Sequence, residues 1–442
     1  MHLYSADYLI LFLPVFMGVY ALLPAPRRPA AIALANVIFL ATAGEFGLIG
    51  FFITLASAYF SGISIYNMRG RPEKQQLRKR LLGANIILYV LGFVFFAITG
   101  TGGLKRTLLD PASVYCHAVI PLHLISYLLD IYRGGCEAET SVMSLMAYAG
   151  FFPSASFGPV LRYKCFANSF RAPRITAAKL TPGVRLYIFG LAEYLLIARQ
   201  LESVRTEIVT APDSLRSGTA WLFVPVFYVM FAVSLMSLLN MGRGTAMMLG
   251  FYVRPRRRLV FFEPSIRRCI SHYNEPLAKW FGDYLTKPAA ARFGNVQFAV
   301  MLSVCAGALW FRLSIGWLLT GLAAAAAVII RGNLYEKNRK LPKAVNGLIT
   351  KLFMLALIVL CAFLELPSAG FAIFGSARGG DASYTLHLIR ESIIPLTAGA
   401  AVISPLPFAL VRKMKMTWIR SLMPIIDAVL LVLCISFIVN TV

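Results

Sequence analysis

The sequence predicts an all-α protein that crosses a membrane many times. Of its 442 residues, 58% are hydrophobic and only 14% are charged. A water-soluble chain of this length could not bury so much apolar surface. Apolar runs long enough to cross the hydrocarbon core of a bilayer recur from one end of the sequence to the other. These runs are too long for the strands of a β-barrel, and they lack the alternation of apolar and polar residues that such strands show.

The first part of the chain contains five predicted spans, and the basic residues between them set their direction. Lys and Arg cluster after the first, third and fifth spans, at Arg27, between Arg69 and Arg80, and at Arg133. Because cytoplasmic loops carry an excess of these residues, we expect these loops in the cytoplasm and the N-terminus outside. Residues 1–6 lack the basic region of a signal peptide, so the first run is expected to stay in the membrane. The five spans are Tyr8–Leu23, Ala30–Ala43, Leu48–Tyr66, Leu81–Ile98 and Val114–Ile131.

The apolar segment Val142–Leu161 differs from these spans because Gly150, Pro153, Gly158 and Pro159 interrupt it. Basic residues follow it directly, so both of its ends are expected on the cytoplasmic side. Irregular backbone at membrane depth is tolerated only where protein or a water-filled cavity covers it. We therefore expect a re-entrant segment here.

The remaining spans bring the predicted total to about eleven or twelve, in a single domain that extends over residues 1–442. They are Val184–Ala198, Trp221–Leu239, Val296–Leu313, Ile315–Ile330, Leu348–Leu364, Ile393–Leu410 and Trp418–Val439. Acidic residues mark the predicted outer loops, Glu202, Glu207 and Asp213 in one and Glu365, Asp381 and Glu391 in another. His387 falls in the same outer region, before the span that begins at Ile393.

The formal charge of +24 would indicate nucleic-acid binding in a soluble protein. Here the excess follows the pattern of cytoplasmic loops, and no nucleic-acid recognition module is present, so we predict lipid head groups as partners and no nucleic acid. The seven cysteines contain no CxxC pair, and several lie within apolar runs. They predict neither a disulfide framework nor a zinc site, and the sequence indicates no metal and no bound cofactor.

The stretch Ser265–Pro288 is the longest interruption of the apolar pattern that keeps a regular spacing. Tyr273, Leu277, Trp280 and Tyr284 recur at intervals of three and four residues, and they would share one face of a helix. Charged residues are interspersed among them. The pattern predicts one amphipathic helix at the edge of the bilayer or inside a cavity within it.

Five motifs in order carry a family resemblance. They are SYLLDIYRG at Ser126–Gly134, FFPSASFGPVLRY at Phe151–Tyr163, MMLGF at Met247–Phe251, WFGDYLTKP at Trp280–Pro288 and GALWFR at Gly307–Arg312. With this spacing, the chain resembles the membrane-bound O-acyltransferase (MBOAT) family, and in particular its bacterial DltB/AlgI-like branch, from about residue 126 to residue 321. The resemblance implies a ring of tilted helices around a central tunnel, with re-entrant and amphipathic helices lining it.

The resemblance also implies an activity and a location. Members pass an acyl group such as D-alanyl or acetyl from a cytoplasmic thioester donor to a hydroxyl of a cell-envelope polymer, in the bacterial plasma membrane. The donor would be carried on the phosphopantetheine of a carrier protein or on coenzyme A. Matched residue by residue, the tunnel and site would involve Arg162, Asn240, Tyr273, Trp280, Asp283, Tyr284, Trp310 and Phe311.

The chain departs from the family at the residues that carry the chemistry. The two family histidines associated with acyl transfer fall on Asn274 and Phe311, and a family aspartate falls on Asn240. A hydroxyl nucleophile needs a base that accepts its proton near neutral pH, which an asparagine amide and a phenyl ring cannot do. His272 is the nearest histidine, but on a continuous helix it would face away from Asn274.

Other candidates remain open. His117 and His123 lie within one predicted span, where an ionisable residue is a functional candidate and a neutral histidine is also tolerated. Arg254, Arg256, Arg257 and Arg258 form either a lipid-facing charge cluster or a docking site for an acidic acyl carrier protein. Two functions follow: an O-acyltransferase with an altered base, or a non-catalytic homologue that binds an acyl donor or lipid and serves an active partner enzyme outside the cytoplasm.

Overall fold

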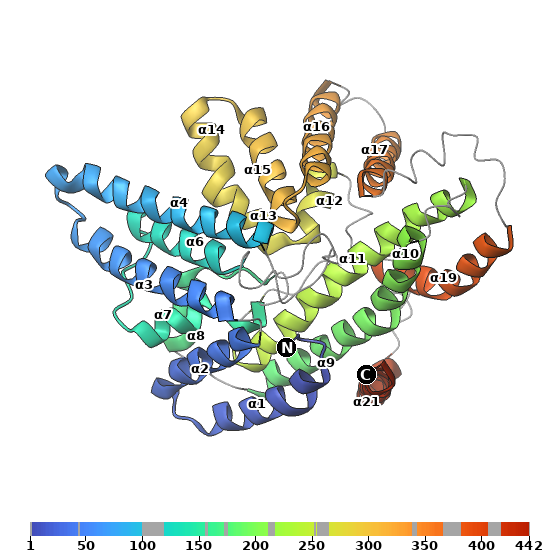
Figure 1. The fold of residues 1–442 in the computed structure, drawn as a ribbon, viewed down its shortest axis with the longest axis horizontal. Coiled ribbons are helices and arrows are strands. Elements are labelled where there is room, and N and C mark those ends of the chain that lie inside the picture. The colour runs from blue at the N-terminus through green and yellow to red at the C-terminus, as the bar shows by residue number, and fades with distance from the viewer. Residues whose placement is uncertain are drawn as a thin grey trace. The chain divides into compact units, whose positions relative to one another are not determined.

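The computed structural model describes residues 2–42, 45–99, 119–154, 158–171, 176–210, 217–251, 253, 265–337, 343–365, 382–404 and 417–441. All regular secondary structure within these residues is helical, as predicted (Figure 1). The chain divides into two compact units, Met1–Ile188 with Leu238–Arg254, and Phe189–Ser237 with Pro255–Val442. Two helices, α9 (Ala177–Glu193) and α11 (Ser217–Met248), each contribute residues to both units.

The first unit is a bundle of helices in which segments distant in sequence pack together. Helix α2 lies against α7, and α3 lies against both α4 and α6. Gly183 on α9 and Gly244 on α11 let these two helices approach closely, because a Cβ atom on Gly244 would lie 2.6 Å from the Gly183 carbonyl oxygen. The other helices are η1 (Asp7–Phe12), α1 (Leu13–Leu22), α2 (Arg28–Ala41), α3 (Glu45–Asn67), α4 (Gln75–Thr99), α6 (Ile120–Arg133), α7 (Val142–Ala149) and α8 (Tyr163–Arg171).

The predicted interruption of Val142–Leu161 is confirmed, and one buried amide covers its backbone. Helix α7 ends at Ala149, and a short helix, η6 (Phe152–Ser154), follows. The Phe152 amide donates to Asn36 Oδ1 over 2.9 Å. The Asn36 amide nitrogen donates to the carbonyls of Met146 and Ala147 over 3.1 and 3.2 Å. This one side chain on α2 thus bonds three backbone groups beside the break, one of which, the Met146 carbonyl, also accepts the Gly150 amide proton.

His123 on α6 supports the far end of the same segment. Its Nε2 accepts the Leu161 amide proton over 3.3 Å, so the ring carries its proton on Nδ1, which lies 3.3 Å from the Ala149 carbonyl oxygen. The Tyr148 hydroxyl donates to the Leu161 carbonyl over 3.0 Å. Both ring nitrogens of His123 therefore bond backbone groups, and this indicates a structural role for the residue. His117, the other histidine of that predicted span, lies outside the described residues.

The second unit contains four helices that pack in chain order and a short helix that crosses them. Helix α14 (Lys287–Phe293) lies against α15 (Val296–Phe311), α15 against α16 (Ile315–Lys337), and α16 against α17 (Lys343–Glu365) (Figure 1). Helix α12 (Ile266–Tyr273) packs on α16 and α17. Its Ile266 and Cys269 are buried with Ala327 and Met354 in one apolar cluster.

The second unit contains further helices. They are η7 (Tyr194–Ala198), α10 (Arg199–Thr210), α13 (Glu275–Phe281), η9 (Gly282–Thr286), α19 (Ala382–Ile403) and α21 (Thr417–Thr441). Gly399 brings α19 close to its neighbours, because a Cβ atom there would lie 2.4 Å from Val229 and 3.1 Å from Ile197. These close approaches fix α19 against both α11 and η7.

The chain is a multi-pass membrane protein. Within the described residues, eight helices are long and apolar enough to cross a membrane, and three shorter apolar helices accompany them. Many of their large apolar side chains are exposed, as on helices that face lipid. The eight are Gly47–Asn67, Pro72–Ala97, Ala177–Thr210, Gly218–Met248, Ile315–Gly332, Gly347–Leu364, Ser383–Ile403 and Leu422–Val439.

Two predicted outer loops prove to be helical. Glu202 and Glu207 lie on α10, and His387 and Glu391 lie on α19, which begins at Ala382 and not at Ile393. The prediction followed only the apolar runs, but polar pairs continue both helices beyond them. Glu202 pairs with Arg205 over 2.7 Å, and His387 Nε2 lies 3.5 Å from Glu391 Oε1 one turn along. Asp213 and Asp381 lie outside the described residues.

Candidate functional site

The stretch predicted as one amphipathic helix, Ser265–Pro288, is broken at Asn274. Helix α12 ends at Tyr273, and Asn274 has φ −140° and ψ 81°. Pro276 explains the break, because it has no amide proton for the His272 carbonyl and its ring would clash with that carbonyl in a continuous helix. Asn274 then caps α13, its side-chain oxygen accepting the Leu277 amide proton over 3.2 Å.

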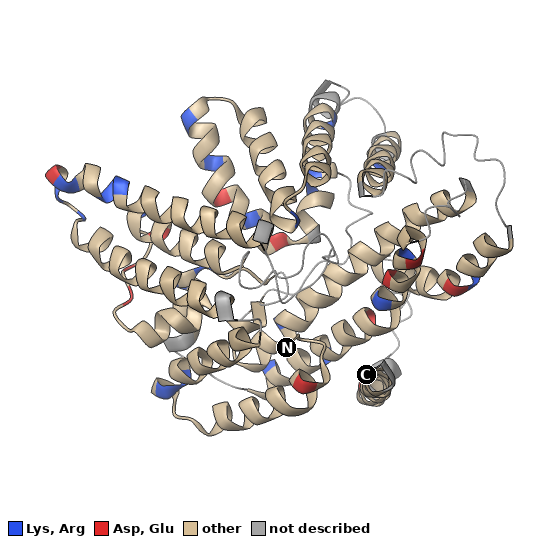
Figure 2. Ribbon diagram, viewed as in Figure 1, with Lys and Arg blue, Asp and Glu red and all other residues tan. Residues whose placement is uncertain are grey.

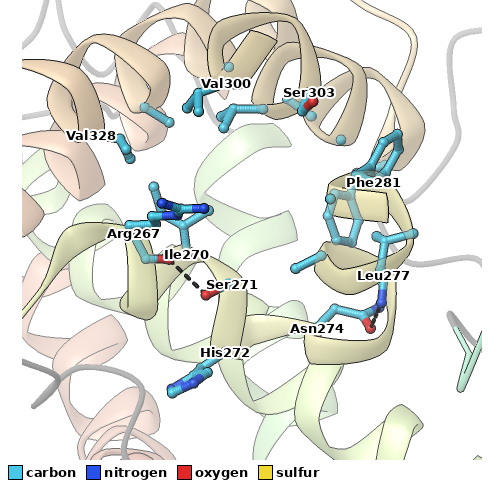
Figure 3. A pocket seen from close by; sticks show the side chains of 18 of the residues that line it. Arg267, Ile270, Ser271, His272, Asn274, Leu277, Phe281, Val300, Ser303 and Val328 are labelled. Carbon is cyan, nitrogen blue, oxygen red and sulfur yellow. Dashed lines mark hydrogen bonds between the residues drawn. The ribbon is translucent and has the colours of Figure 1, made fainter. Parts of the chain in front are cut away.

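A cavity of about 580 Å³ lies beside this break, between α11, α12, α13, η9, α15 and α16 (Figure 3). One wall comes from α12 and α13 and mixes polar with apolar residues. Its polar residues are Arg267, Ser271, His272, Asn274, Glu275 and Lys279, and Ile270, Leu277 and Ala278 lie among them. The opposite wall, on α15 and α16, is apolar apart from Ser303 and Thr320. Its apolar residues include Val300, Val304, Ala308, Ala324 and Val328.

Small residues form the seam between α15 and α16 at this cavity. A Cβ atom on Gly321 would lie 2.9 Å from both the Ala308 Cβ and the Cys305 Cα, so only glycine permits this separation of the helices. Gly321, Ala324 and Val328 recur at three- and four-residue intervals and share one face of α16. On α15, Ser303 Oγ accepts a hydrogen bond from Thr286 Oγ1 over 2.7 Å, and this bond joins η9 to α15.

Phe311, predicted to fall at the second family histidine position, belongs to an aromatic cluster at one part of the cavity. Its ring centroid lies 5.9 Å from that of Phe231 on α11 and 5.8 Å from that of Trp317 on α16. Phe231 and Trp317 are also in contact, with centroids 5.7 Å apart. The cluster supplies apolar surface and stacking at this part of the cavity.

Asn274, predicted to fall at the first family histidine position, is 4% exposed and lines the same cavity. The structure thus brings Asn274 and Phe311 to one site. His272, the last residue but one of α12, is also among the residues that line the cavity. Its ring extends from α12 on the side away from Val300 and Val328 (Figure 3).

The other family-matched residues of this unit support the cavity from behind. Trp280 and Tyr284 are buried and pack on each other, with ring centroids 5.2 Å apart. Trp310 is buried on α15. Asp283 forms an ion pair with Lys287 Nζ over 2.6 Å, one turn further along the chain. These four are absent from the described lining of the cavity.

The remaining predicted site residues are not in this cavity. Arg162 is half-buried and Asn240 is buried, both in the first unit. The side chain of Tyr273 lies outside the described part of the structure. So do all four arginines of the predicted docking cluster, Arg254, Arg256, Arg257 and Arg258.

Sequence reasoning missed part of the cavity wall. Phe231, Ser303, Thr286 and Trp317 were not predicted, and they come from four different elements. The small residues of α16 did carry a readable signal, since their helical spacing indicates one packed face. No pattern within α11 indicated which of its many apolar residues would meet that face.

Comparison with known proteins finds one family and a group of relatives. Residues 116–372 match the model of the MBOAT, membrane-bound O-acyltransferase family. The chain is 25% identical over 356 residues to the probable alginate O-acetylase AlgI of Pseudomonas syringae pv. tomato, which covers 76% of this chain and 68% of that protein. The protein of the same name from Azotobacter vinelandii is 26% identical to this chain, and the match covers 69% of this chain and 64% of that protein. The one from Pseudomonas aeruginosa is 25% identical, and the match covers 72% of this chain and 63% of that protein.

Proposed function

Because the chain belongs to the membrane-bound O-acyltransferase family, we propose that it takes part in O-acylation of a cell-envelope polymer. Its role is to hold the acyl donor in the cavity of the second unit while the family's histidine base is supplied elsewhere. The observation that carries this proposal is that Asn274 and Phe311 stand at the two positions predicted to match the family histidines. Asn274 and Phe311 line one cavity, and neither side chain can accept a proton from a hydroxyl.

The shape and polarity of the cavity support a role in donor binding. An acyl thioester has an apolar acyl and sulfur region beside polar amide groups. The α15–α16 wall offers apolar surface to the first, and the α12–α13 wall offers hydrogen-bonding groups to the second. Asn274 lies in that wall, and its side-chain oxygen caps α13.

The relatives favour acetyl as the group transferred. The similar proteins of three bacteria are named probable alginate O-acetylases. We propose for this chain an acetyl donor on coenzyme A or on the phosphopantetheine of a carrier protein, with D-alanyl as the alternative donor group. The proposed setting is the bacterial plasma membrane with the N-terminus outside. Arg254, Arg256, Arg257 and Arg258 are the proposed docking residues for an acidic carrier, and a second acyltransferase outside the cytoplasm is the proposed source of the base.

A second candidate function is favoured by one observation. His272 lines the same cavity as Asn274, so an imidazole is present at the site although it is displaced by two residues from the family position. In this case the chain is a complete O-acyltransferase, and His272 accepts the proton of the polymer hydroxyl as it attacks the thioester carbonyl. The thiol of the donor then leaves with a proton.

The test measures esters on the envelope polymer in a strain that lacks the gene and carries plasmid-borne variants. Mild alkali releases the acyl groups, and mass spectrometry identifies and counts them. Ala324→Phe fills the cavity from α16, whereas Ala326→Phe adds the same ring on the exposed side of the same helix. We expect Ala324→Phe to reduce acylation at least about tenfold and Ala326→Phe to leave it near the wild-type level, since only the first occupies the donor's space.

His272→Ala decides between the two candidates. Retained acylation supports donor binding without a histidine base, and a loss of about two orders of magnitude or more assigns the base to His272. Each variant's amount in the membrane is measured by immunoblot, so that loss of the protein is not read as loss of function. Envelope esters that stay unchanged when the gene is deleted would overturn both candidates.

A further inference from the structure

Three metal-ligating side chains of the second unit meet away from the cavity. Glu207 comes from α10, and His387 and Glu391 come from consecutive turns of α19. One ligand atom of each lies within 4.8 Å of the other two. Helices α10 and α19 pack against each other, and acidic residues occur on both (Figure 2). It is the one such group among the described residues.

Helix α19 is held in place by contacts that do not involve these groups. Gly399 allows α19 to approach Val229 and Ile197, and Thr219 Oγ1 lies 3.0 Å from Thr385 Oγ1. His387 and Glu391 are one helical turn apart and therefore project from the same face of α19. The backbone thus brings the three residues near one point.

The three side chains themselves carry more negative than positive charge. Two carboxylates face one imidazole, whose protonation could offset only one of them. Arg205, on the same helix as Glu207, has its guanidinium bonded to Glu202 over 2.7 and 3.0 Å. Like charges at this separation disfavour each other, and a divalent ion between them would remove that cost.

The donor set matches a first-row transition metal. Two carboxylate oxygens and one imidazole nitrogen suit zinc and its neighbours, whereas calcium and magnesium prefer oxygen ligands throughout. Two ligands of a tetrahedral zinc ion, each bound at about 2.0–2.1 Å, lie about 3.3–3.4 Å apart. The distance from His387 Nε2 to Glu391 Oε1 is 3.5 Å, close to that value without any rearrangement.

Access to the site agrees with this assignment. The side chains of His387 and Glu391 are 56% and 48% exposed, and Glu207 is half-buried one turn before α10 ends at Thr210. An ion could therefore enter directly from the surface. The sequence places all three residues in regions predicted to lie outside, on the same side of the membrane.

We propose that Glu207, His387 and Glu391 form a binding site for a divalent transition-metal ion of the zinc class, which ties α10 to α19. Three protein ligands leave at least one coordination position for water or for an anionic group. The proposal does not depend on the acyl-donor cavity, because no residue is shared between them.

The test titrates Zn²⁺ into the purified full-length protein, prepared without a polyhistidine tag, and follows binding by calorimetry. We expect the wild type to bind one ion. Glu207→Gln, His387→Asn and Glu391→Gln should each weaken binding at least about tenfold, because even loss of an outer-shell partner costs about 10–100-fold in metal affinity. Glu202→Gln is the matched control: it removes a carboxylate from the same helix, outside the site, and should bind as the wild type does.

A second measurement keeps the result interpretable if a variant folds poorly. Thermal unfolding of each protein is compared in Zn²⁺ and in a chelator, and only a protein that binds the ion gains a higher melting temperature with Zn²⁺. The gain is expected in the wild type and in Glu202→Gln and not in His387→Asn. Absence of binding to the wild type, or equal binding by all of the variants, would overturn the proposal. Neither outcome bears on the proposed acylation.

Discussion

Asn274 has a structural role at the start of α13 and cannot act as a proton-accepting base. In this chain its side-chain oxygen accepts the Leu277 amide proton and begins a new helix. An oxygen held in this way shapes the cavity wall but performs no proton transfer. Phe311 likewise has a packing role, since its ring joins an aromatic cluster. At the two positions predicted to match the family histidines, one residue therefore caps a helix and the other packs.

The capping role predicts a stability change that Asn295 can calibrate. Asn295 caps α15 in the same manner, accepting the Phe298 amide proton over 3.0 Å, and it lies away from the cavity. Asn274→Ala and Asn295→Ala should each lower the free energy of unfolding by about 1 kcal/mol, the usual cost of losing such a cap. Chemical denaturation in detergent measures both. No loss in Asn274→Ala beside a clear loss in Asn295→Ala would remove the capping role from Asn274.

At the scale of elements, the cavity depends on how closely α15 and α16 approach. Gly321 sits where a Cβ atom would meet the Cys305 backbone, and backbone cannot move aside as a flexible side chain can. Gly332 lies on the same helix with nothing within 4 Å of its Cβ position. Alanine substitution at Gly321 therefore tests the effect of close packing, and alanine substitution at Gly332 tests the effect of helix propensity alone.

We expect Gly321→Ala to destabilise the protein by about 1–3 kcal/mol, the usual cost of an inserted methyl group in a packed contact. Gly332→Ala should instead stabilise it by up to about 1 kcal/mol, because alanine is the better helix former. Thermal unfolding of the two variants under identical conditions makes the comparison. Equal effects of the same sign would show that the α15–α16 separation is not set at Gly321.

Elements built from long apolar runs could be predicted from the sequence, and elements set by polar detail could not. Helices α3, α4, α16 and α17 contain their predicted spans, since the apolar run itself specifies them. The break at Asn274 was missed although Asn-Glu-Pro is a readable helix start, because the apolar spacing on both sides continued through it. The meeting of Glu207 with His387 was beyond any local pattern, since it depends on how α19 returns to α10.

At the scale of the whole molecule, the direction of the chain through the membrane is a prediction from its basic loops. It places Lys74, between α3 and α4, in the cytoplasm, and Thr210, at the end of α10, outside. In a chain whose native cysteines are replaced by serine, a membrane-impermeant maleimide should label Thr210→Cys in intact cells. Lys74→Cys should react only after the membrane is opened. The reverse pattern would invert the topology and place the Glu207–His387–Glu391 group in the cytoplasm.

The amide of Asn36 has a consequence for how the chain is made. Its partners, the Met146 carbonyl and the Phe152 amide, are separated from it by 110 and 116 residues. At synthesis rates of about 5–20 residues per second, they emerge from the ribosome about 6–23 s after Asn36 does. During that interval α2 carries a polar group whose final partners do not yet exist. The hydrogen bonds of Asn36 therefore cannot form until the broken segment has been synthesised. Assembly of the first unit in the membrane cannot be completed before that.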